Sequence, residues 1–314
     1  MGIGTFTQVN GIASAVGNFF DPDMAHAITV PGIGDYSIAV VVASLILAVC
    51  VALVVIGGIR RIAEVSQIIV PFMAVIYVLF AVILILFNIT EIPHAIVVIV
   101  KSAFVPSSIA GGIAGTMIIA MQKGVARGIF SNEAGLGSAP IAAAAAQTKE
   151  PVRQGLVSMT GTFLDTIVIC TLTGLSIVVT GAWSVDGLEG VAVTTYAFQT
   201  GLPIPAGVSA FILMVCLVFF AFTTILGWDY YSERCLEYLS NGNMTAVKAY
   251  RWLYIIAVFI GPYMTVSAVW TIADIFNGLM AIPNMIALIV LSGVVVRETK
   301  DYFTRNPLEG AKKK

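Results

Sequence analysis

The sequence is poor in charged residues, in histidine and in grouped cysteines. Only 11% of its 314 residues are Asp, Glu, Lys or Arg, whereas about one quarter is usual in soluble proteins. The formal net charge is −1, and no basic face suits nucleic acid. The two histidines, His26 and His94, lie far apart in the chain, and the four cysteines are single. These shortages argue against a nucleic-acid partner and against a His- or Cys-based metal or redox site.

The sequence instead contains long apolar stretches: the whole chain is 59% hydrophobic and has a mean hydropathy of +0.98. A helix needs about 20 apolar residues to cross a bilayer. The sequence therefore predicts an all-α polytopic membrane protein with about seven spans. The expected spans are 38–59, 65–87, 109–146, 154–182, 206–231 and two within 251–296 that meet near Gly261-Pro262. Residues 1–16 are too short to span, and they fit either an amphipathic segment or the remainder of a membrane helix.

The polar segments between these spans fall into two sets. Residues 17–37, 88–108 and 183–204 are predicted to be loops on one side, with Lys101 as their only basic residue. The other set, which includes Arg60-Arg61 at the expected end of a span, the connector 232–250 and the charged tail 297–314, holds most of the 16 Lys and Arg. Since basic loops stay in the cytoplasm, the C-terminal tail is expected there, in a multi-pass protein of the plasma membrane.

The expected span 109–146 is interrupted in its middle by polar residues and glycine. Between Phe130 and Pro140 it holds Ser131, Asn132, Glu133, Ala134, Gly135, Leu136, Gly137, Ser138 and Ala139. A helix broken at membrane depth leaves backbone groups unpaired, and these need protein, water or a ligand as partners. Freed N–H groups at the start of a second half-helix carry the positive end of its dipole and suit a carboxylate. Freed carbonyls at the end of the first half-helix suit an ammonium group or Na⁺, so the break fits an amino acid. The alternatives are a simple kinked span and a phosphate-binding loop, although the Gly-Lys-Ser/Thr of that loop is lacking.

Five charged residues within the expected spans are candidates for a functional role, because charge at membrane depth is costly. They are Lys123, Arg127, Glu133, Asp165 and Asp274. In the functional interpretation, these charged side chains line a cavity or pair with one another, and Lys123 and Arg127 lie at an outward vestibule. In the alternative, each side chain reaches the membrane interface.

A further cluster is Thr223-Thr224 with Trp228. Its hydroxyls either bond back to their own helix or offer oxygen to a hard cation. Trp228 fits either an interfacial belt or the wall of a pocket.

Several longer motifs carry a family resemblance. They are Gly4-Thr5-Phe6-Thr7-Gln8-Val9-Asn10, Gly57-Gly58-Ile59-Arg60-Arg61-Ile62-Ala63, Phe130 through Ala142, Pro151 through Leu156, Phe222 through Trp228 and Ala273 through Asn284. Over nearly its whole length the chain resembles the alanine/glycine:cation symporter family, the sodium:alanine symporters. The resemblance implies one transporter domain, 1–314, with a LeuT-like inverted-repeat fold. Residues 1–108 would be a partial first repeat, 109–296 the second repeat and 297–314 a cytoplasmic tail.

The resemblance also implies a site. Phe130, Ser131, Asn132, Gly135, Trp228 and Gln8 would bind the substrate, Thr223 and Thr224 would bind Na⁺, and Arg127 and Asp274 would form a gate or vestibule. The implied function is Na⁺-coupled import of alanine or glycine across the lipid bilayer, without catalysis, without an organic cofactor and with no metal other than Na⁺.

The chain departs from the family pattern in two respects. Ala143 stands where the family usually has histidine. Only core helices 3 to 10 of the LeuT-like fold are recognisable, so the chain as written is expected to be a fragment that does not transport. The alternatives are a structural membrane fragment and an intramembrane enzyme using Asp165 or Glu133, which no paired carboxylates support.

Overall fold

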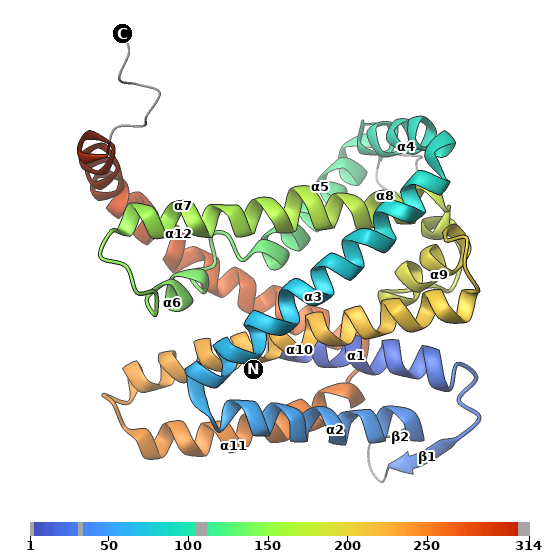
Figure 1. The fold of residues 1–314 in the computed structure, drawn as a ribbon, viewed down its shortest axis with the longest axis horizontal. Helices are drawn as coiled ribbons and strands as arrows, with labels where there is room; N and C mark the ends of the chain where they lie inside the picture. Colours follow the sequence, from blue (N-terminus) through green and yellow to red (C-terminus); the bar gives the residue numbers. More distant parts are fainter. Residues whose placement is uncertain (1–2, 31–33, 105–111, 307–314) are drawn as a thin grey trace.

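The computed structural model describes residues 3–30, 34–104 and 112–306, which are mostly helical (Figure 1). The helices are α1 (Gly4–Phe20), α2 (Ile38–Val55), α3 (Gly58–Phe87), α4 (Ile92–Phe104), α5 (Gly112–Asn132), α6 (Ala139–Ala143), α7 (Pro151–Phe163), α8 (Thr171–Val179), α9 (Val191–Gly201), α10 (Ala206–Leu239), α11 (Met244–Ile260) and α12 (Val266–Arg305). Shorter turns are η1 (Ile89–Glu91), the π-helical η2 (Leu164–Cys170), η3 (Ala182–Ser184) and η4 (Gly261–Tyr263), and the strands are β1 (Ala27–Val30) and β2 (Gly34–Ser37).

Six of the described helical segments are long and apolar enough to cross a membrane. They are Ile38–Val55, Gly58–Phe87, Pro151–Val179, Ala206–Leu239, Met244–Tyr263 and Val266–Arg305. They correspond to six of the predicted spans, including the pair that meets at Gly261-Pro262. The remaining expected span, 109–146, is the interrupted one, and its residues 109–111 lie outside the described part. The prediction of a polytopic membrane protein is therefore confirmed.

The protein is mostly helical, as predicted, but the segment between α1 and α2 departs from the all-α prediction. The predicted loop 17–37 contains an antiparallel hairpin in which β1 pairs with β2, with Ile28 opposite Tyr36. Asp21 anchors this hairpin, because its carboxylate accepts hydrogen bonds from the Ser37 hydroxyl at 2.6 Å and from the Ala25 amide at 2.8 Å. The hairpin is short and contains charged residues and glycines, so the pattern of apolar residues in the sequence did not predict it.

Three other polar segments are more helical than predicted. The expected loop 88–108 contains η1 and α4, with residues 105–108 outside the described part, and 183–204 contains α9. The expected connector 232–250 is mostly helix: α10 continues to Leu239, and α11 begins at Met244 after a tight turn. Asn243 starts α11, because its side-chain oxygen accepts hydrogen bonds from the amides of Thr245 and Ala246.

The basic pair Arg60-Arg61 was expected to end a span, but it begins the next one. The chain turns at Gly57-Gly58, where Gly58 has φ +71°, and the pair lies in the first turn of α3. At the other end of the chain, α12 carries the charged residues of the tail as far as Arg305, and Lys312 to Lys314 lie outside the described part.

The helices form two layers joined by long crossing helices (Figure 1). One layer holds α1, α2, α10 and α11, the other holds α4, α5, α7 and α8, and α3 crosses between them. The core of the first layer includes Val51, Val55, Ile225, Leu226, Tyr254 and Val258. A second core joins α3, α8, α9 and α10 through Tyr77, Leu84, Phe198 and Leu213. Helix α1 packs against α10, α2 and η4 with buried residues on several sides, so it is a core helix and not an amphipathic surface segment.

Candidate functional site

The break after α5 is the centre of the candidate site, and the structure confirms that the helix is interrupted there. The helix ends at Asn132, and the chain takes positive φ values at Glu133 (+55°), Gly135 (+87°) and Gly137 (+81°). Glycine adopts this conformation freely, but a glutamate rarely does. Such strain is typical of functional positions and needs support from the surroundings.

Side chains of the break supply part of that support. The Asn132 side-chain oxygen accepts a hydrogen bond from the Ala134 amide at 2.9 Å, and the Ser138 hydroxyl donates to Glu133 Oε2 at 2.8 Å. The N–H groups of Gly135 and Gly137 form no hydrogen bond within the described residues. The break leaves these two donors free for a ligand.

One expectation about the break needs correction. The sequence predicted a second half-helix whose dipole would attract a carboxylate, but α6 has only five residues. Because the macrodipole is the sum of aligned peptide units, so short a helix has a small one. Free amide donors, and not a helix dipole, are what the break offers to an anion.

The polar end of α5 meets the π-helical turn between α7 and α8. The Ser131 hydroxyl donates to Asp165 Oδ2 at 2.7 Å, and the Asn132 side-chain amide donates to the Thr166 hydroxyl at 3.1 Å. Asp165, predicted to be a charge at membrane depth, therefore has a partner. π-helical turns are rare and occur often at functional sites. No feature of the sequence predicted this turn or the role of Thr166.

Arg127 joins α5 to α12. Its guanidinium forms two hydrogen bonds to Asp274, at 2.9 Å and 3.0 Å, and its Cζ lies 4.0 Å from the centre of the Trp270 ring. The Phe130 ring lies 5.1 Å from that of Trp270. The side chains of Arg127 and Asp274 are 36% and 37% exposed, so the pair is open to exchange with solvent. Trp270 was not predicted, although it lies one helical turn before Asp274 on the same face.

Trp228 lies buried on α10, against α1. A Cβ atom at Gly4 would come within 1.8 Å of the indole nitrogen, so only glycine fits there. Gln8 lies one turn after Gly4, on the same face of α1. The Tyr231 ring lies 5.6 Å from that of Trp228, and its hydroxyl faces the Glu133 carboxylate. Tyr231 therefore connects Trp228 to the break, a role that the sequence did not reveal.

The threonine pair on α10 bonds back to its own helix. The Thr223 hydroxyl donates to the carbonyls of Phe219 and Phe220, and the Thr224 hydroxyl donates to that of Phe220 at 2.9 Å. A hydroxyl that donates its hydrogen still has lone pairs that a cation can use. Thr224 lies one turn before Trp228, on the same face of α10.

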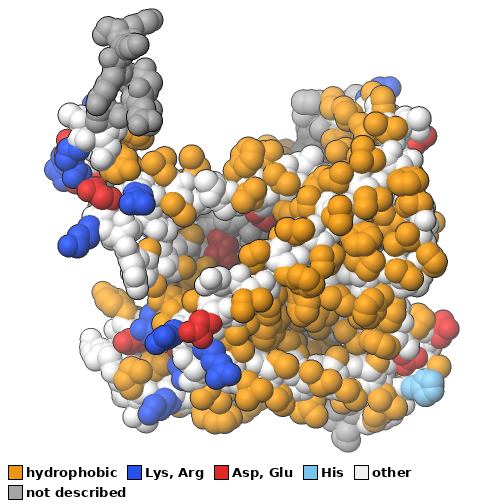
Figure 2. Space-filling model, viewed as in Figure 1, with side chains coloured by type: hydrophobic (Ala, Val, Ile, Leu, Met, Phe, Trp, Pro, Cys, Tyr) orange, Lys and Arg blue, Asp and Glu red, His pale blue; other side chains and the backbone are white. Residues whose placement is uncertain are grey.

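The structure thus brings the predicted residues together in two groups. Phe130, Ser131, Asn132 and Gly135 lie at the break, with Arg127 and Asp274 beside Phe130. Trp228, Thr223 and Thr224 lie on α10, and Gln8 lies on α1 one turn after Gly4, which contacts Trp228. Tyr231 bridges the two groups. Figure 2 shows a hollow between the two layers of helices, with acidic side chains on its floor.

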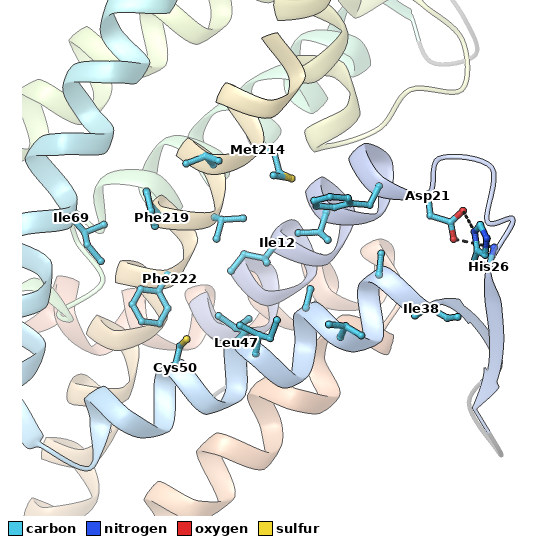
Figure 3. Close-up of a pocket in the computed structure, with 18 residues that line it drawn as sticks. Ile12, Asp21, His26, Ile38, Leu47, Cys50, Ile69, Met214, Phe219 and Phe222 are labelled. Carbon is cyan, nitrogen blue, oxygen red and sulfur yellow. Dashed lines mark hydrogen bonds and ion pairs between the residues drawn. The ribbon is translucent and has the colours of Figure 1, made fainter. Parts of the chain in front are cut away.

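A groove of about 820 Å³ lies elsewhere, between α1, α2, α3 and α10 (Figure 3). Its walls are almost entirely apolar, as Ile12, Leu47, Met214 and Phe222 illustrate. Asp21 and His26 bond to each other at one end. A zwitterion would find no polar partner along these walls, so the groove does not suit an amino acid.

Apolar helices long enough to span a bilayer define a multi-pass membrane protein, and a further helix is broken at polar residues that leave backbone donors free. The comparison with known proteins narrows this class. The chain belongs to the sodium:alanine symporter family, whose sequence model matches residues 1–314.

Individual relatives agree with this assignment. The chain is 53% identical over 305 residues to an uncharacterized transporter of Haemophilus influenzae, and 44% identical over 304 residues to the sodium/alanine symporter AgcS of Methanococcus maripaludis. These alignments cover 97% and 96% of the chain but 62% of either relative. A probable sodium/glutamine symporter, GlnT of Bacillus subtilis, is 40% identical over 82% of the chain and 52% of its own length. These names are those of transporters, and none supports the alternative of an intramembrane enzyme.

Proposed function

We propose that the protein acts in Na⁺-coupled import of a small neutral amino acid, alanine or glycine, by alternating access. The observation that carries this proposal is the break after α5, which combines two unpaired backbone amides with the polar side chains of Ser131 and Asn132. The name of the Methanococcus relative supports sodium and alanine as the two solutes.

The break and Trp228 together form the proposed amino-acid site. The substrate carboxylate accepts hydrogen bonds from the free amides of Gly135 and Gly137. The ammonium group donates to the carbonyls at the end of α5 and to the Asn132 side-chain oxygen, which is already oriented toward the break. Phe130, Gln8 and the Trp228 ring enclose a space for a short side chain, which favours alanine or glycine over larger residues.

Na⁺ binds at Thr223 and Thr224 in this proposal. Hydroxyl and backbone oxygens are the ligands that a hard cation prefers. Na⁺ that binds the outward-open state more tightly than the inward-open one raises the population of the state with high substrate affinity, and this difference couples the two solutes. Arg127 and Asp274 form the gate, because their exposed pair can open and close between α5 and α12.

The topology that we propose is a LeuT-like inverted repeat, with residues 1–108 in the first repeat and 109–296 in the second. Lys and Arg side chains gather along the edge where α10 ends, α7 begins and α12 ends (Figure 2). By the positive-inside rule this edge faces the cytoplasm, which places the C-terminal tail there. The opposite edge, with the hairpin, faces outward.

A matched pair of variants in proteoliposomes tests the coupling. Thr224→Ala removes a proposed Na⁺ ligand, whereas Thr160→Ala removes a hydroxyl that bonds back to its own helix in the same manner at an exposed position of α7. We expect Na⁺-driven alanine counterflow to require a higher Na⁺ concentration for Thr224→Ala only. An equal Na⁺ requirement for both variants, or alanine counterflow without Na⁺, would contradict the proposal.

A further inference from the structure

A buried carboxylate without a hydrogen-bond partner among the described residues lies in the packing between α10 and α11. Asp229 is 0% exposed, and neither of its carboxylate oxygens has a hydrogen-bond partner among the described residues. It belongs to the apolar segment Ala206–Leu239, which is long enough to span the membrane. An ionised carboxylate out of water and without partners is strongly disfavoured, and such a group takes up a proton or a cation instead.

The neighbours of Asp229 do not supply the missing charge. Glu233, one turn further along α10, takes both hydrogen bonds of the Arg251 guanidinium, at 2.5 Å and 2.8 Å. From α11, Tyr250 and Tyr254 face the Asp229 carboxylate. The Tyr254 hydroxyl already donates to the Ile225 carbonyl, and the buried Tyr250 hydroxyl has no partner in the described part of the chain.

The other elements packed against α10 bring no further charge to this position. Helices α1 and α6 contain no titratable side chain, and α2 and α9 contribute only Cys50 and Tyr196. The charged residues of α3 are Arg60, Arg61 and Glu64, which are exposed at its start. The charges that act on Asp229 from the described helices are therefore Glu233 and Arg251.

These charges do not balance. Among the described residues, two buried carboxylates share one guanidinium, which leaves an excess of one negative charge there. A metal cation would need several oxygen ligands, but in the described part of the chain neither oxygen of Asp229 has another polar atom within hydrogen-bond distance. A proton needs only the carboxylate itself.

We propose that Asp229 is a proton-binding site, protonated in the conformation seen here, with the Glu233–Arg251 pair as the fixed charge beside it. The proton leaves when water reaches the α10–α11 interface, or when Arg251 turns from Glu233 to Asp229. Either change alters the packing of α10, the helix that carries Trp228. This assignment does not depend on the transport proposal.

Infrared spectroscopy of the purified protein in lipid tests the assignment directly. A protonated carboxyl group has a C=O stretching band well separated from those of carboxylates and amides, and it shifts in deuterated water. At neutral pH we expect one such band, lost completely in Asp229→Asn and unchanged in Asp274→Asn, whose carboxylate pairs with Arg127. Circular dichroism checks that each variant keeps its helices.

The same infrared measurement on a further variant and on the unmodified protein makes the test decisive. Glu233→Gln frees Arg251, so the Asp229 band should disappear at a lower pH than in the unmodified protein. The absence of the band from the unmodified protein, or its survival in Asp229→Asn, would overturn the proposal. So would a carboxylate band that responds to Na⁺ in place of the protonated band, because the site would then bind a metal cation. None of these outcomes depends on alanine binding, so they leave the proposed transport function unaffected.

Discussion

The two sides of the candidate site are built differently. In the most apolar stretch of α10, 39% of residues are buried by neighbouring helices, whereas the figure for the helix formed by α7, η2 and α8 is 6%. On the α10 side, Trp228 is held by α1, and the Tyr254 hydroxyl bonds to the Ile225 carbonyl and meets the Thr5 hydroxyl. On the α5 side, the Ser131–Asp165 hydrogen bond is exposed.

This difference in packing indicates that the two sides of the site have different roles. The packed side is a scaffold that fixes Trp228 and the threonine pair. The open side holds its polar groups through single hydrogen bonds that a ligand can replace at small cost. Elements that move or bind ligands generally come from the less stable part of a structure. We therefore expect substitutions in the packed side to reduce stability, and substitutions in the open side to act mainly on binding.

The largest loss of stability is expected for Tyr254→Ala. Tyr254 is fully buried, and deletion of a buried aromatic side chain costs about 3–5 kcal/mol in free energy of unfolding. Trp252→Ala, two positions earlier on the same helix, removes a ring that is 60% exposed and should change stability by about 0.5 kcal/mol or less. Unfolding in detergent micelles measures both. Similar losses for the two variants would abolish the distinction between a packed and an open side.

A smaller loss is expected for Gly4→Ala. The added methyl group would overlap the Trp228 indole, and overpacking of this kind costs about 1–3 kcal/mol. Gly11→Ala provides a control on the same helix, since a Cβ there would have no atom within 4 Å. The control should be neutral or stabilising by up to about 1 kcal/mol, because alanine favours helix over glycine. Thermal unfolding and the fluorescence of Trp228 measure the difference, and equal behaviour of the two variants would contradict the close contact.

A still smaller effect is expected for the pair at the edge of the open side. Arg127→Met and Asp274→Asn, combined in a double-mutant cycle, should give a coupling free energy of about 0.2–1 kcal/mol, because both groups are partly exposed. Added salt should reduce it further. A coupling of several kcal/mol that does not respond to salt would show that this pair is a structural element and not a gate.

The smallest effect concerns the hairpin, and it depends on pH. The hydrogen bond from Ser37, reinforced by the amides of His26 and Ala25, holds the pKa of the Asp21 carboxyl below its usual range. Its stabilising effect is therefore complete above the unfolded pKa of about 3.9 and is lost as the pH falls through the lower folded value.

The protection factors of the β1 and β2 amides, which compare their exchange with the intrinsic rate at the same pH, should therefore fall in acid, and Asp21→Asn should have low protection factors at every pH. Asp23→Asn, two positions further on, serves as the control and should leave the exchange unchanged. Protection factors that are independent of pH in the unmodified protein would show that Asp21 does not anchor the hairpin.

The sequence predicted those parts of the molecule whose signal is local. Long apolar runs predicted the spans, and the glycine and polar residues between Phe130 and Pro140 predicted the break, since each follows from the composition of one segment. The hairpin, α4 and α9 were missed, because their short apolar stretches lie among polar residues and do not differ from loops in composition.

The partners of the site residues were harder to predict than the residues themselves. Asp165 meets Ser131 through a π-helical turn, which shifts the faces of α7 and α8 relative to the regular helical period. Tyr231 and Trp270 act through contacts between helices that are distant in the sequence, and single-sequence patterns carry no record of such contacts. The roles of the individual site residues remain predictions.

Binding of radiolabelled alanine to the purified protein, in NaCl and in choline chloride, tests the central claim most directly. The account predicts saturable binding that requires Na⁺ and that weakens roughly tenfold or more in Asn132→Ala, because a hydrogen bond to a charged group contributes about 1.5–3 kcal/mol. Asn306→Ala, at the exposed end of α12, should bind as the unmodified protein does. Equal binding in choline chloride, or undiminished binding by Asn132→Ala, would contradict the assignment of the break after α5 as the amino-acid site.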